Sequence, residues 1–235
     1  MNPYSPEQFF DFSNSPAAEL FRDCTYVWEA VKALPGYIEA IIKPELSGKV
    51  EEGAWLEPGR VQLGEGSRVE RGAIIRGPAI IGRNTVVRTG AYIRGHVMTG
   101  ENCLIGHGTE LRQVLILNNS NIPHQNCIFT SLIGNRVRMG GHTSSANFRL
   151  DGREIILRLP MDGENRSFPT GLTLLGVVMG DDTSIGGMSL INPGTLIGQR
   201  CLAYGPCSLS GLIPHDSIVK RKATPFEITK RTDPK

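Results

Sequence analysis

The side chain best suited to acid–base chemistry is His124, which lies in the stretch SNIPHQNC directly after Pro123. Imidazoles exchange a proton near neutral pH, so a histidine can remove a proton from an amine or a hydroxyl group. Proline at position 123 fixes φ and has no amide hydrogen, which would hold the following histidine in one orientation. The same residue can equally be a solvated turn histidine, so its role depends on the elements that position it.

Four more histidines and five cysteines are the other candidates for chemistry. His142 is of most interest because it follows Gly141 in the stretch MGGHT, whereas we expect solvent-facing turn residues at His96, His107 and His215. The cysteines form no CxxC pair and no Cys/His cluster with zinc spacing, so we expect neither a disulfide framework nor a metal site. They lie at positions 24, 103, 127, 201 and 207. This pattern favours a reducing compartment.

The composition argues against a strongly charged partner. The chain of 235 residues has 25 Lys and Arg residues and 23 Asp and Glu residues, so its net field favours neither nucleic acid nor an anionic membrane. No apolar run approaches the ~18 residues that would span a bilayer, and the N-terminus has no secretion-signal pattern. We therefore expect a soluble, cytoplasmic protein with no nucleic acid and no membrane as partner.

A period of six residues predicts the fold. Aliphatic residues occupy nine of ten positions in steps of six from Leu63 to Leu117, and the same spacing returns from Met179 to Leu209. A mostly small series accompanies the first one from Ser67 to Asn121. Short flat strands joined by tight turns explain this pattern, because alternation alone gives an ordinary strand and a period of 3.6 gives a helix. Three such strands close one coil, so the prediction is an all-β, parallel β-helix.

Three segments lack this repeat. Residues 1–45 have an amphipathic helical pattern, and we expect a small N-terminal helical cap whose Trp28 face packs on the first coil. We expect the β-helix over 46–219, with a projecting arm at 145–175, where Asp-Gly pairs and prolines break the period. Residues 220–235 are expected to be a basic, loosely held tail. The flat faces of a lone prism would leave apolar surface exposed.

Two stretches between residues 109 and 150 carry a resemblance to a known family. They read TELRQVLILNNSNIPHQN and SLIGNRVRMGGHTSSANFRLDG. Together with the repeat, over roughly residues 60–219, they resemble the hexapeptide-repeat C-terminal domain of bifunctional sugar-1-phosphate nucleotidyltransferase/acetyltransferases, including glucosamine-1-phosphate N-acetyltransferase. The resemblance implies a left-handed β-helix, although crossover rules alone would favour the right hand. It also implies a homotrimer.

The resemblance further implies an activity and residue roles. The activity is acetyl transfer from acetyl-CoA to the amine of an amino-sugar phosphate, in a cleft between subunits, as a step of UDP-N-acetylglucosamine biosynthesis. On this interpretation His124 is the general base and the backbone N–H of Gly141 binds the oxyanion. Asn147 would bind the sugar or hold the acyl group. Arg149 and Arg153 would meet the phosphate, with Arg153 standing where the family tends to have lysine.

Other positions depart from the family or allow two interpretations. Three residues after the base the family usually has tyrosine, and here the residue is Cys127; where the bacterial branch has a sugar-contacting asparagine, this chain has Arg138. We expect these two side chains and His142 to line the substrate site. The basic run at the C-terminal end either binds the phosphates of CoA or is a solvated tail, and it comprises Lys220, Arg221 and Lys222.

The nucleotidyltransferase half of such proteins has no counterpart in this sequence. The residues outside the repeat are too few for a glycine-rich nucleotide loop with its metal-binding aspartates, so we expect no pyrophosphorylase activity and no metal. Two alternatives stay open beside acetyl transfer to glucosamine-1-phosphate. One is an enzyme with another acceptor; the other is a non-enzymatic trimer that binds sugar phosphates or nucleotide sugars, or that scaffolds a separate nucleotidyltransferase.

Overall fold

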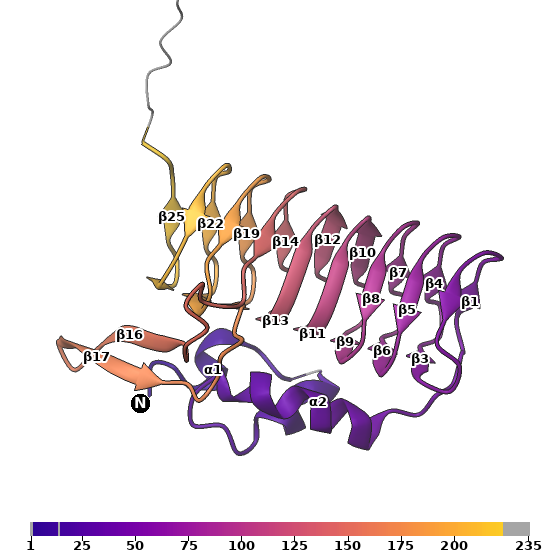
Figure 1. Ribbon diagram of the computed structural model, residues 1–235, viewed down its shortest axis with the longest axis horizontal. Helices are drawn as coiled ribbons and strands as arrows, with labels where there is room; N and C mark the ends of the chain where they lie inside the picture. Colours follow the sequence, from indigo (N-terminus) through magenta and orange to yellow (C-terminus); the bar gives the residue numbers. More distant parts are fainter. Residues whose placement is uncertain (1, 14, 223–235) are drawn as a thin grey trace, which may run out of the picture.

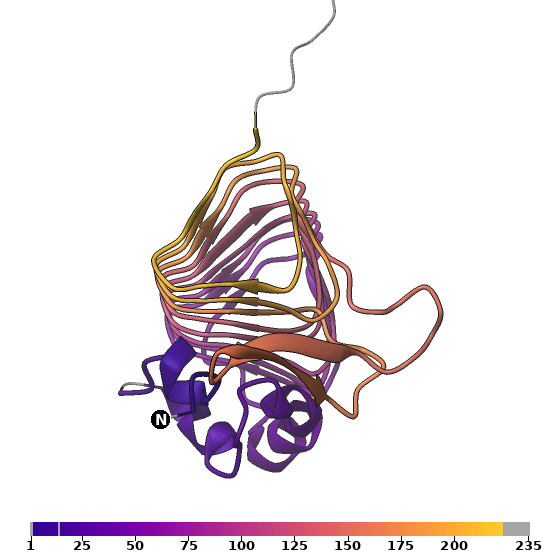
Figure 2. The same cartoon turned by 90° about the vertical axis from the view of Figure 1, so that its left-hand side faces the viewer.

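The computed structural model describes residues 2–13 and 15–222 and is a left-handed parallel β-helix with three faces (Figures 1 and 2). The predicted fold class is therefore confirmed. Coils stack along one axis, and each coil contributes one short strand to each face. We number the faces 1 to 3 in chain order, and we name each corner by the two faces that it joins.

Face 1 is a nine-stranded parallel sheet within the described residues. Its strands are β1 (Lys49–Val50), β4 (Arg68–Val69), β7 (Val86–Val87), β10 (Leu104–His107), β12 (Asn121–His124), β14 (Arg138–Met139), β19 (Ser184–Ile185), β22 (Leu202–Ala203) and β25 (Ile218–Val219). Face 2 comprises β2 (Trp55–Leu56), β5 (Ile74–Arg76), β8 (Tyr92–Arg94), the first parts of β11 (Glu110–Ile116) and β13 (Cys127–Ile133), β15 (Ser144–Ser145), β20 (Leu190–Ile191) and β23 (Ser208–Leu209).

Face 3 is continuous with face 2, because β11 and β13 pass around the corner between them. Besides the second parts of these two strands it comprises β3 (Val61–Leu63), β6 (Ala79–Ile81), β9 (Val97–Thr99), β18 (Val177–Met179), β21 (Thr195–Ile197) and β24 (Leu212–Ile213). Neighbouring coils are in register throughout: Val86 pairs with Arg68 on one side and with Leu104 on the other. In these first coils, residues 18 apart in the sequence therefore stack in one column, whereas the spacing is 17 where Leu104 pairs with Asn121.

The aliphatic series fills the interior of the prism, as its period predicts, except at one point. Leu63 through Leu111 are buried inside, but the next position of the series inside the prism is taken by Ile116 and not by Leu117. The turn at Gln113, where φ is 52°, is one residue shorter than its predecessors. Leu115 and Leu117 consequently point out of the prism. They pack in a second apolar cluster, which the outward side chains of face 3 form with the N-terminal helices and the arm and which we call the outer apolar cluster. Asn121 points outward on face 1. The predicted series is displaced by one residue here, because steps of six assume coils of 18 residues and this coil has 17.

Tight turns with positive φ form the corners. At corner 3/1, consecutive coils place Asn84, Asn102 and Asn119 at φ values of 53°, 55° and 61°. Asparagine is one of the few residues besides glycine that adopts this region at low cost. The polar corner residues therefore follow from backbone geometry and need no functional explanation.

The helical N-terminal segment that the sequence predicts is present, but it lies along face 3, and its Trp28 side does not pack on the first coil as expected. Its helices are α1 (Pro6–Phe9), the 3₁₀ helix η1 (Pro16–Phe21) and α2 (Glu29–Ile41), which runs beside the coils in Figure 1. Trp28, Val31 and Leu34 pack against the outward side chains of face 3. Those side chains are Ile80, Met98, Leu115, Leu132, Val178 and Leu196. Face 3 attracts the helices because its outward column is aliphatic, and burying each such side chain contributes about 1.5–3 kcal/mol.

The predicted arm leaves the prism at corner 2/3 and folds back over face 3. It contains the antiparallel hairpin of β16 (Ile156–Met161) and β17 (Glu164–Pro169), which lies next to the helices in Figure 2. Leu157 and Leu159 of the hairpin are buried against the outer apolar cluster. Because β14 pairs directly with β19, the stack of coils continues without a gap past the arm.

Asp181 is buried and joins the N-terminal segment to corner 3/1. Its carboxylate accepts hydrogen bonds from the backbone N–H groups of Asn135 (2.7 Å) and Asp11 (2.9 Å), and from the side-chain amide of Asn135. The backbone N–H of Asp181 donates to the carbonyl of Phe9. Burial raises the pKa of Asp181, although these N–H donors and Arg136 favour its charged form.

We predict that Asp181→Asn lowers the free energy of unfolding by about 1–3 kcal/mol, because an amide would direct N–H groups at buried N–H donors. The control is Asp182→Asn, which removes an exposed ion pair with Arg136 and should cost less than about 1 kcal/mol. Urea denaturation followed by circular dichroism measures both. Equal losses in the two variants would contradict the inference that Asp181 fastens the N-terminal segment.

Candidate functional site

His124 ends β12 at corner 1/2, where its side chain is exposed. It is in register with His107 of the preceding coil, and its carbonyl accepts a hydrogen bond from the backbone N–H of His142 in the next coil. The sequence places a proline before His124 and a positive-φ residue, Gln125, after it, so the backbone turns sharply at this point. The geometry therefore presents the imidazole to solvent, as the sequence predicts.

A column of glycines continues from His124 along corner 1/2. A Cβ atom built on Gly141 would lie 3.2 Å from the Cβ atom of His124, and one built on Gly187 would lie 3.0 Å from the carbonyl oxygen of Gly141. In this column His124 has a side chain, and the two coils that follow present only the backbone of glycine residues. Within the described residues, the N–H of Gly141 donates to no acceptor. An unpaired N–H beside an exposed imidazole is the donor that an oxyanion site needs.

The other histidines differ in surroundings. His107 is exposed, and its Nδ1 atom lies 2.8 Å from the carbonyl oxygen of Thr89. His142 is exposed at corner 1/2 with φ of 58°. His96 lies 3.9 Å from Glu39, and burial lowers its pKa.

The expectation of a solvent-facing residue is wrong for His215. Its ring is half-buried against Phe9, with 5.8 Å between the ring centroids. Its Nδ1 atom accepts a hydrogen bond from the backbone N–H of Gln199. His215 therefore belongs to the contact between the coils and the N-terminal segment.

Face 2 carries a column of arginine residues that none of the sequence motifs predicts. Arg76 and Arg94 are paired residues of neighbouring strands, and Arg112 stands next along the same column. All three side chains are exposed. Arg94 forms an ion pair with Glu110 at 2.7 Å, whereas Arg112 has no carboxylate within ion-pair distance among the described residues. Stepping through the sequence by 18 from Arg76 would have found this column, because three hexapeptides make one coil.

Cys127 also lies on face 2, between Glu110 and Ser144 of the adjacent coils. It is half-buried and points outward, because the next residue, Ile128, takes the interior position. Burial and the charge of Glu110 raise the pKa of the Cys127 thiol. Such surroundings disfavour the thiolate, so Cys127 is suited to lining a site and unsuited to attacking a substrate.

Asn147 lies at corner 2/3, on the opposite edge of face 2 from His124. Its side-chain amide donates to the hydroxyl of Thr130 at 2.9 Å, and its carbonyl accepts from the N–H of Leu175. Five residues of extended backbone separate Asn147 from His142, which corresponds to about 16 Å. The chain therefore does not bring Asn147 and His124 together within one subunit.

Arg138 is exposed on face 1, three residues before Gly141. It lines an apolar hollow of about 410 Å³ that reaches two coils further, to Leu202 and Tyr204. The predicted substrate residues thus separate onto two faces, because Cys127 lies on face 2. Corner 1/2, with His124 and Gly141, divides them.

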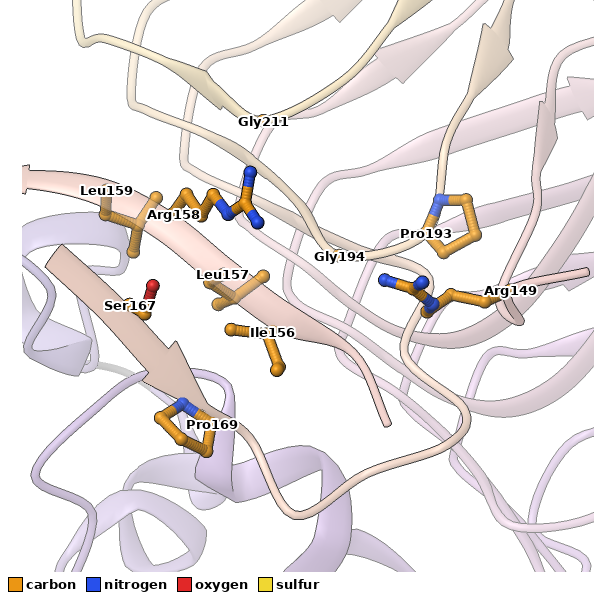
Figure 3. Close-up of a pocket in the computed structure, with 10 residues that line it drawn as sticks. All are labelled: Arg149, Ile156, Leu157, Arg158, Leu159, Ser167, Pro169, Pro193, Gly194 and Gly211. Atoms are coloured by element: carbon orange, nitrogen blue, oxygen red, sulfur yellow. The ribbon is translucent and has the colours of Figure 1, made fainter. Parts of the chain in front are cut away.

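Arg149 and Arg153 lie in the exposed loop between β15 and the arm hairpin. Arg149 binds Asp151 through two hydrogen bonds, of 2.9 and 2.6 Å, and this guanidinium holds the pKa of Asp151 well below its usual range. The backbone N–H of Arg153 also donates to Asp151. In Figure 3 the guanidinium of Arg149 faces the space beside Pro193.

The basic run at the C-terminal end belongs to corner 1/2. Lys220 lies over the ring of Tyr204, with 5.6 Å from Nζ to the ring centroid, and Lys222 is exposed. Lys220 and Arg221 line a hollow of about 520 Å³ together with Met188, Leu190, Pro206, Cys207, Ser208 and Val219. Three strand spacings, or about 14 Å, lie along the corner between His124 and Pro206. Residues 223–235 of the predicted tail lie outside the described residues.

Among residues 2–13 and 15–222, no group of three or more histidine, cysteine, aspartate and glutamate side chains is arranged to hold a metal ion. In the same residues no helix has the length and apolar character needed to cross a membrane.

We predict that Gly140→Ala destabilises the protein more than Gly141→Ala does. A Cβ atom at position 140 would lie 2.2 Å from the backbone nitrogen of Gly187, whereas the nearest atom at position 141 is 3.2 Å away. The first variant should lose more than about 2 kcal/mol of unfolding free energy and the second less than about 1 kcal/mol. Thermal denaturation monitored by circular dichroism measures the difference. A smaller loss at position 140 than at 141 would refute the close packing of this glycine column.

Comparison with known proteins gives matches over most of the coils. Residues 75–158 match the family model described as the GMPPB C-terminal domain. The bifunctional protein GlmU of Methanococcus maripaludis is 33% identical over 203 residues, which is 86% of this chain and 47% of that protein. YaiX of Escherichia coli, named a putative uncharacterized acetyltransferase, is 32% identical over 139 residues, which is 59% of each chain.

Comparison with solved structures gives matches of lower sequence identity. The UDP-N-acetylglucosamine acyltransferase of Campylobacter jejuni superposes with a TM-score of 0.47 at 20% identity, covering 70% of this chain and 68% of the other. The acetyltransferase domain of PglB from Neisseria gonorrhoeae gives 0.40 at 17% identity, covering 59% of this chain and 65% of the other. The chain spans less than half the length of the GlmU proteins that it matches. It is a hexapeptide-repeat β-helix that is similar to the C-terminal region of bifunctional GlmU-type proteins.

Proposed function

We propose that this protein is an acetyltransferase that transfers the acetyl group of acetyl-CoA to the amine of an amino-sugar phosphate similar to glucosamine-1-phosphate. The observation that carries the proposal is the pairing of an exposed imidazole, His124, with the unpaired N–H of Gly141 directly beside it. A base next to an oxyanion donor is the minimum that acyl transfer to an amine requires. The sequence similarity to proteins named GlmU and to YaiX supports the same reaction class.

The two groups divide the reaction between them. His124 removes a proton from the acceptor amine as its nitrogen attacks the thioester carbonyl carbon. Negative charge then develops on the carbonyl oxygen, and the N–H of Gly141 donates a hydrogen bond to it. When the intermediate collapses, the carbon–sulfur bond breaks and the amide remains. The CoA sulfur leaves as a thiolate and takes the proton from the imidazolium, so His124 returns to its initial state.

The arginine column of face 2 supports an acceptor that carries a phosphate. Arg112 is exposed without a carboxylate partner among the described residues, and Arg94 forms an ion pair with Glu110. Guanidinium groups bind phosphate oxygens through pairs of N–H donors, and a stacked pair can contact more than one oxygen. The column lies at the corner 2/3 edge of face 2, because Arg112 directly precedes the turn at Gln113, so it is about 16 Å from corner 1/2 of its own chain. In an oligomer the column would therefore approach His124 of the next subunit, together with Asn147.

The hollow at Lys220 and Arg221 supports binding of the phosphates of CoA. It lies on the same corner as His124, and the glycine column between them leaves room for an extended chain. A thioester at His124 would place the pantetheine along bare backbone and the phosphates at the basic end. Met188, which is 72% exposed, would contact the apolar part of that chain.

A complete site on this proposal needs a second subunit. Face 3 is covered by the chain's own helices and arm, so faces 1 and 2 are the ones free to associate. Apolar side chains are exposed on them near the C-terminal coils, including Leu190, Leu202 and Ile218. In a homotrimer, Asn147 and Arg153 of one subunit would approach His124 of the next. Such an arrangement would join residues that lie on opposite edges of face 2 in one chain.

The alternative function is a non-enzymatic module that binds sugar phosphates or nucleotide sugars, or that scaffolds a separate nucleotidyltransferase. The observation that favours it is the match of residues 75–158 to the GMPPB C-terminal domain model. Cys127 and Arg138 also replace residues that the acetyltransferases use. Stabilisation by a nucleotide sugar without any binding of CoA would support this alternative.

We predict that His124→Ala lowers kcat for acetylation of glucosamine-1-phosphate by about 10²-fold or more, because the general base is lost. Release of CoA, measured with a thiol reagent, reports the rate. The matched control is His107→Ala, which removes the in-register histidine of the preceding coil and should keep most of the activity.

Calorimetric titration with acetyl-CoA completes this experiment. Binding of acetyl-CoA that persists in His124→Ala would separate loss of chemistry from loss of the co-substrate. A wild-type protein that neither binds acetyl-CoA nor acetylates any amino-sugar phosphate would end the enzyme proposal.

A mixing experiment tests the shared site. We expect His124→Ala and Asn147→Ala chains to be inactive alone, and mixed oligomers from co-expression to recover activity. In trimers that contain both chains, about a third of the sites would combine an intact His124 with an intact Asn147 of the neighbour. Recovery is measured on oligomers purified through a different tag on each chain. No recovery in oligomers shown to be mixed would mean that the two residues do not act at one site.

A further inference from the structure

A hollow of about 500 Å³ separates the arm hairpin from corner 2/3 of the C-terminal coils. One wall is the outer surface of the hairpin and the other is coil backbone, as Figure 3 shows. Its lining residues are Arg149, Ile156, Leu157, Arg158, Leu159, Ser167, Pro169, Pro193, Gly194 and Gly211. The volume is in the range of small-molecule sites, which lie between about 300 and 1,000 Å³.

The charged side chains that line the hollow are all cationic. Arg149 and Arg158 come from different segments, and both extend into the space beside Gly194 in Figure 3. Among its described lining residues there is no aspartate or glutamate. Asp151 holds Arg149 through Nε and one terminal nitrogen, which leaves the other terminal nitrogen free, and Arg158 has no carboxylate partner in the described residues. A concave surface with cations alone concentrates its field on anions.

The hairpin wall is fixed in place by aromatic contacts. The ring of Phe168 packs edge-on against Tyr4, Tyr26 and Trp28, with centroid distances of 5.8, 5.4 and 5.9 Å. The hydroxyl of Tyr4 also donates a hydrogen bond to the carbonyl of Pro160. These contacts hold the hairpin against the N-terminal segment. The hollow is therefore part of the folded structure and needs no closing movement.

Close contact between the coil backbone at Gly194 and the start of the hairpin fixes the other wall of the hollow. A Cβ atom on Gly194, where φ is 72°, would lie 2.7 Å from Ile155 and 2.8 Å from Leu157. The N–H of Gly194 donates to the carbonyls of Leu175 and Gly176, so the backbone is already satisfied. The polar side chains that line the hollow and can donate hydrogen bonds are those of Arg149, Arg158 and Ser167.

We propose that this hollow is a binding site for the phosphate or diphosphate group of a small molecule. Arg158 would bind the phosphate oxygens through paired N–H donors, with Arg149 and Ser167 completing the contact. Ile156, Pro169 and Pro193 would cover an apolar or ring portion of the same ligand. The site differs from the proposed acetyl-transfer site in the residues that form it, because Arg158, Ser167 and Gly194 lie between the arm hairpin and the coils and have no role in the acetyl-transfer proposal. It stands whether or not the protein is an acetyltransferase.

Titration with inorganic pyrophosphate tests the site. We expect saturable binding by the full chain with a Kd below about 1 mM at constant ionic strength. Arg158→Gln should weaken it at least about tenfold, because a hydrogen bond to a charged group is lost. The matched control is Arg166→Gln, in the partner strand of the hairpin, which pairs with Asp162 and does not line the hollow.

A second control separates this site from the arginine column of face 2. Pyrophosphate binding that persists in Arg112→Gln and is lost in Arg158→Gln would assign it to the hollow. Protection of arm residues 155–169 from hydrogen exchange on adding pyrophosphate would locate it independently. Absence of saturable binding, or equal weakening by Arg158→Gln and Arg166→Gln, would overturn the proposal. Loss in Arg112→Gln alone would also overturn it and would assign the anion to face 2.

Discussion

In-register stacking of short parallel strands determines the rest of this structure. Each strand gives its backbone hydrogen bonds to the coil before and after it, so every residue stands directly over its counterpart in the neighbouring coil. A residue type that recurs at the coil period therefore becomes a continuous column. The aliphatic columns fill the interior. The outward columns give each face its chemical character, and the site, the helix contact and the free surface all follow from them.

The outward column of face 3 explains how the non-repeating segments fold. Its side chains are aliphatic in successive coils, from Ile80 to Leu196, and such a surface is unfavourable in water. The helices and the arm, which come from distant parts of the sequence, both bury their apolar sides on it. Asp181 and the aromatic contacts of Phe168 then fasten the two segments to the coils and to each other. Faces 1 and 2 remain for ligands and for partner subunits.

The candidate catalytic and binding residues lie at different corners and faces, so one chain does not form a complete site. His124 and Gly141 share corner 1/2, the arginine column occupies face 2, and Asn147 lies at the far corner. Positive charge gathers in three separate places: at Arg94 and Arg112, at Lys220 and Arg221, and at Arg149 and Arg158. Because the chain is nearly neutral overall, these local groups rather than a general field must attract anions.

The sequence by itself determined the β-helix, the exposure of His124 and the glycine beside it. These follow from the hexapeptide period and from local turns, which depend on residues close together in the chain. It did not determine the one-residue slip at Ile116, the position of Trp28 on face 3 or the stacking of Arg76, Arg94 and Arg112. Only the tertiary structure decided these, because they depend on which coil lies beside which and on where an amphipathic helix finds its apolar partner. Periodicity specifies neighbours within a coil, whereas packing between coils, helices and arm specifies the surface that a ligand meets.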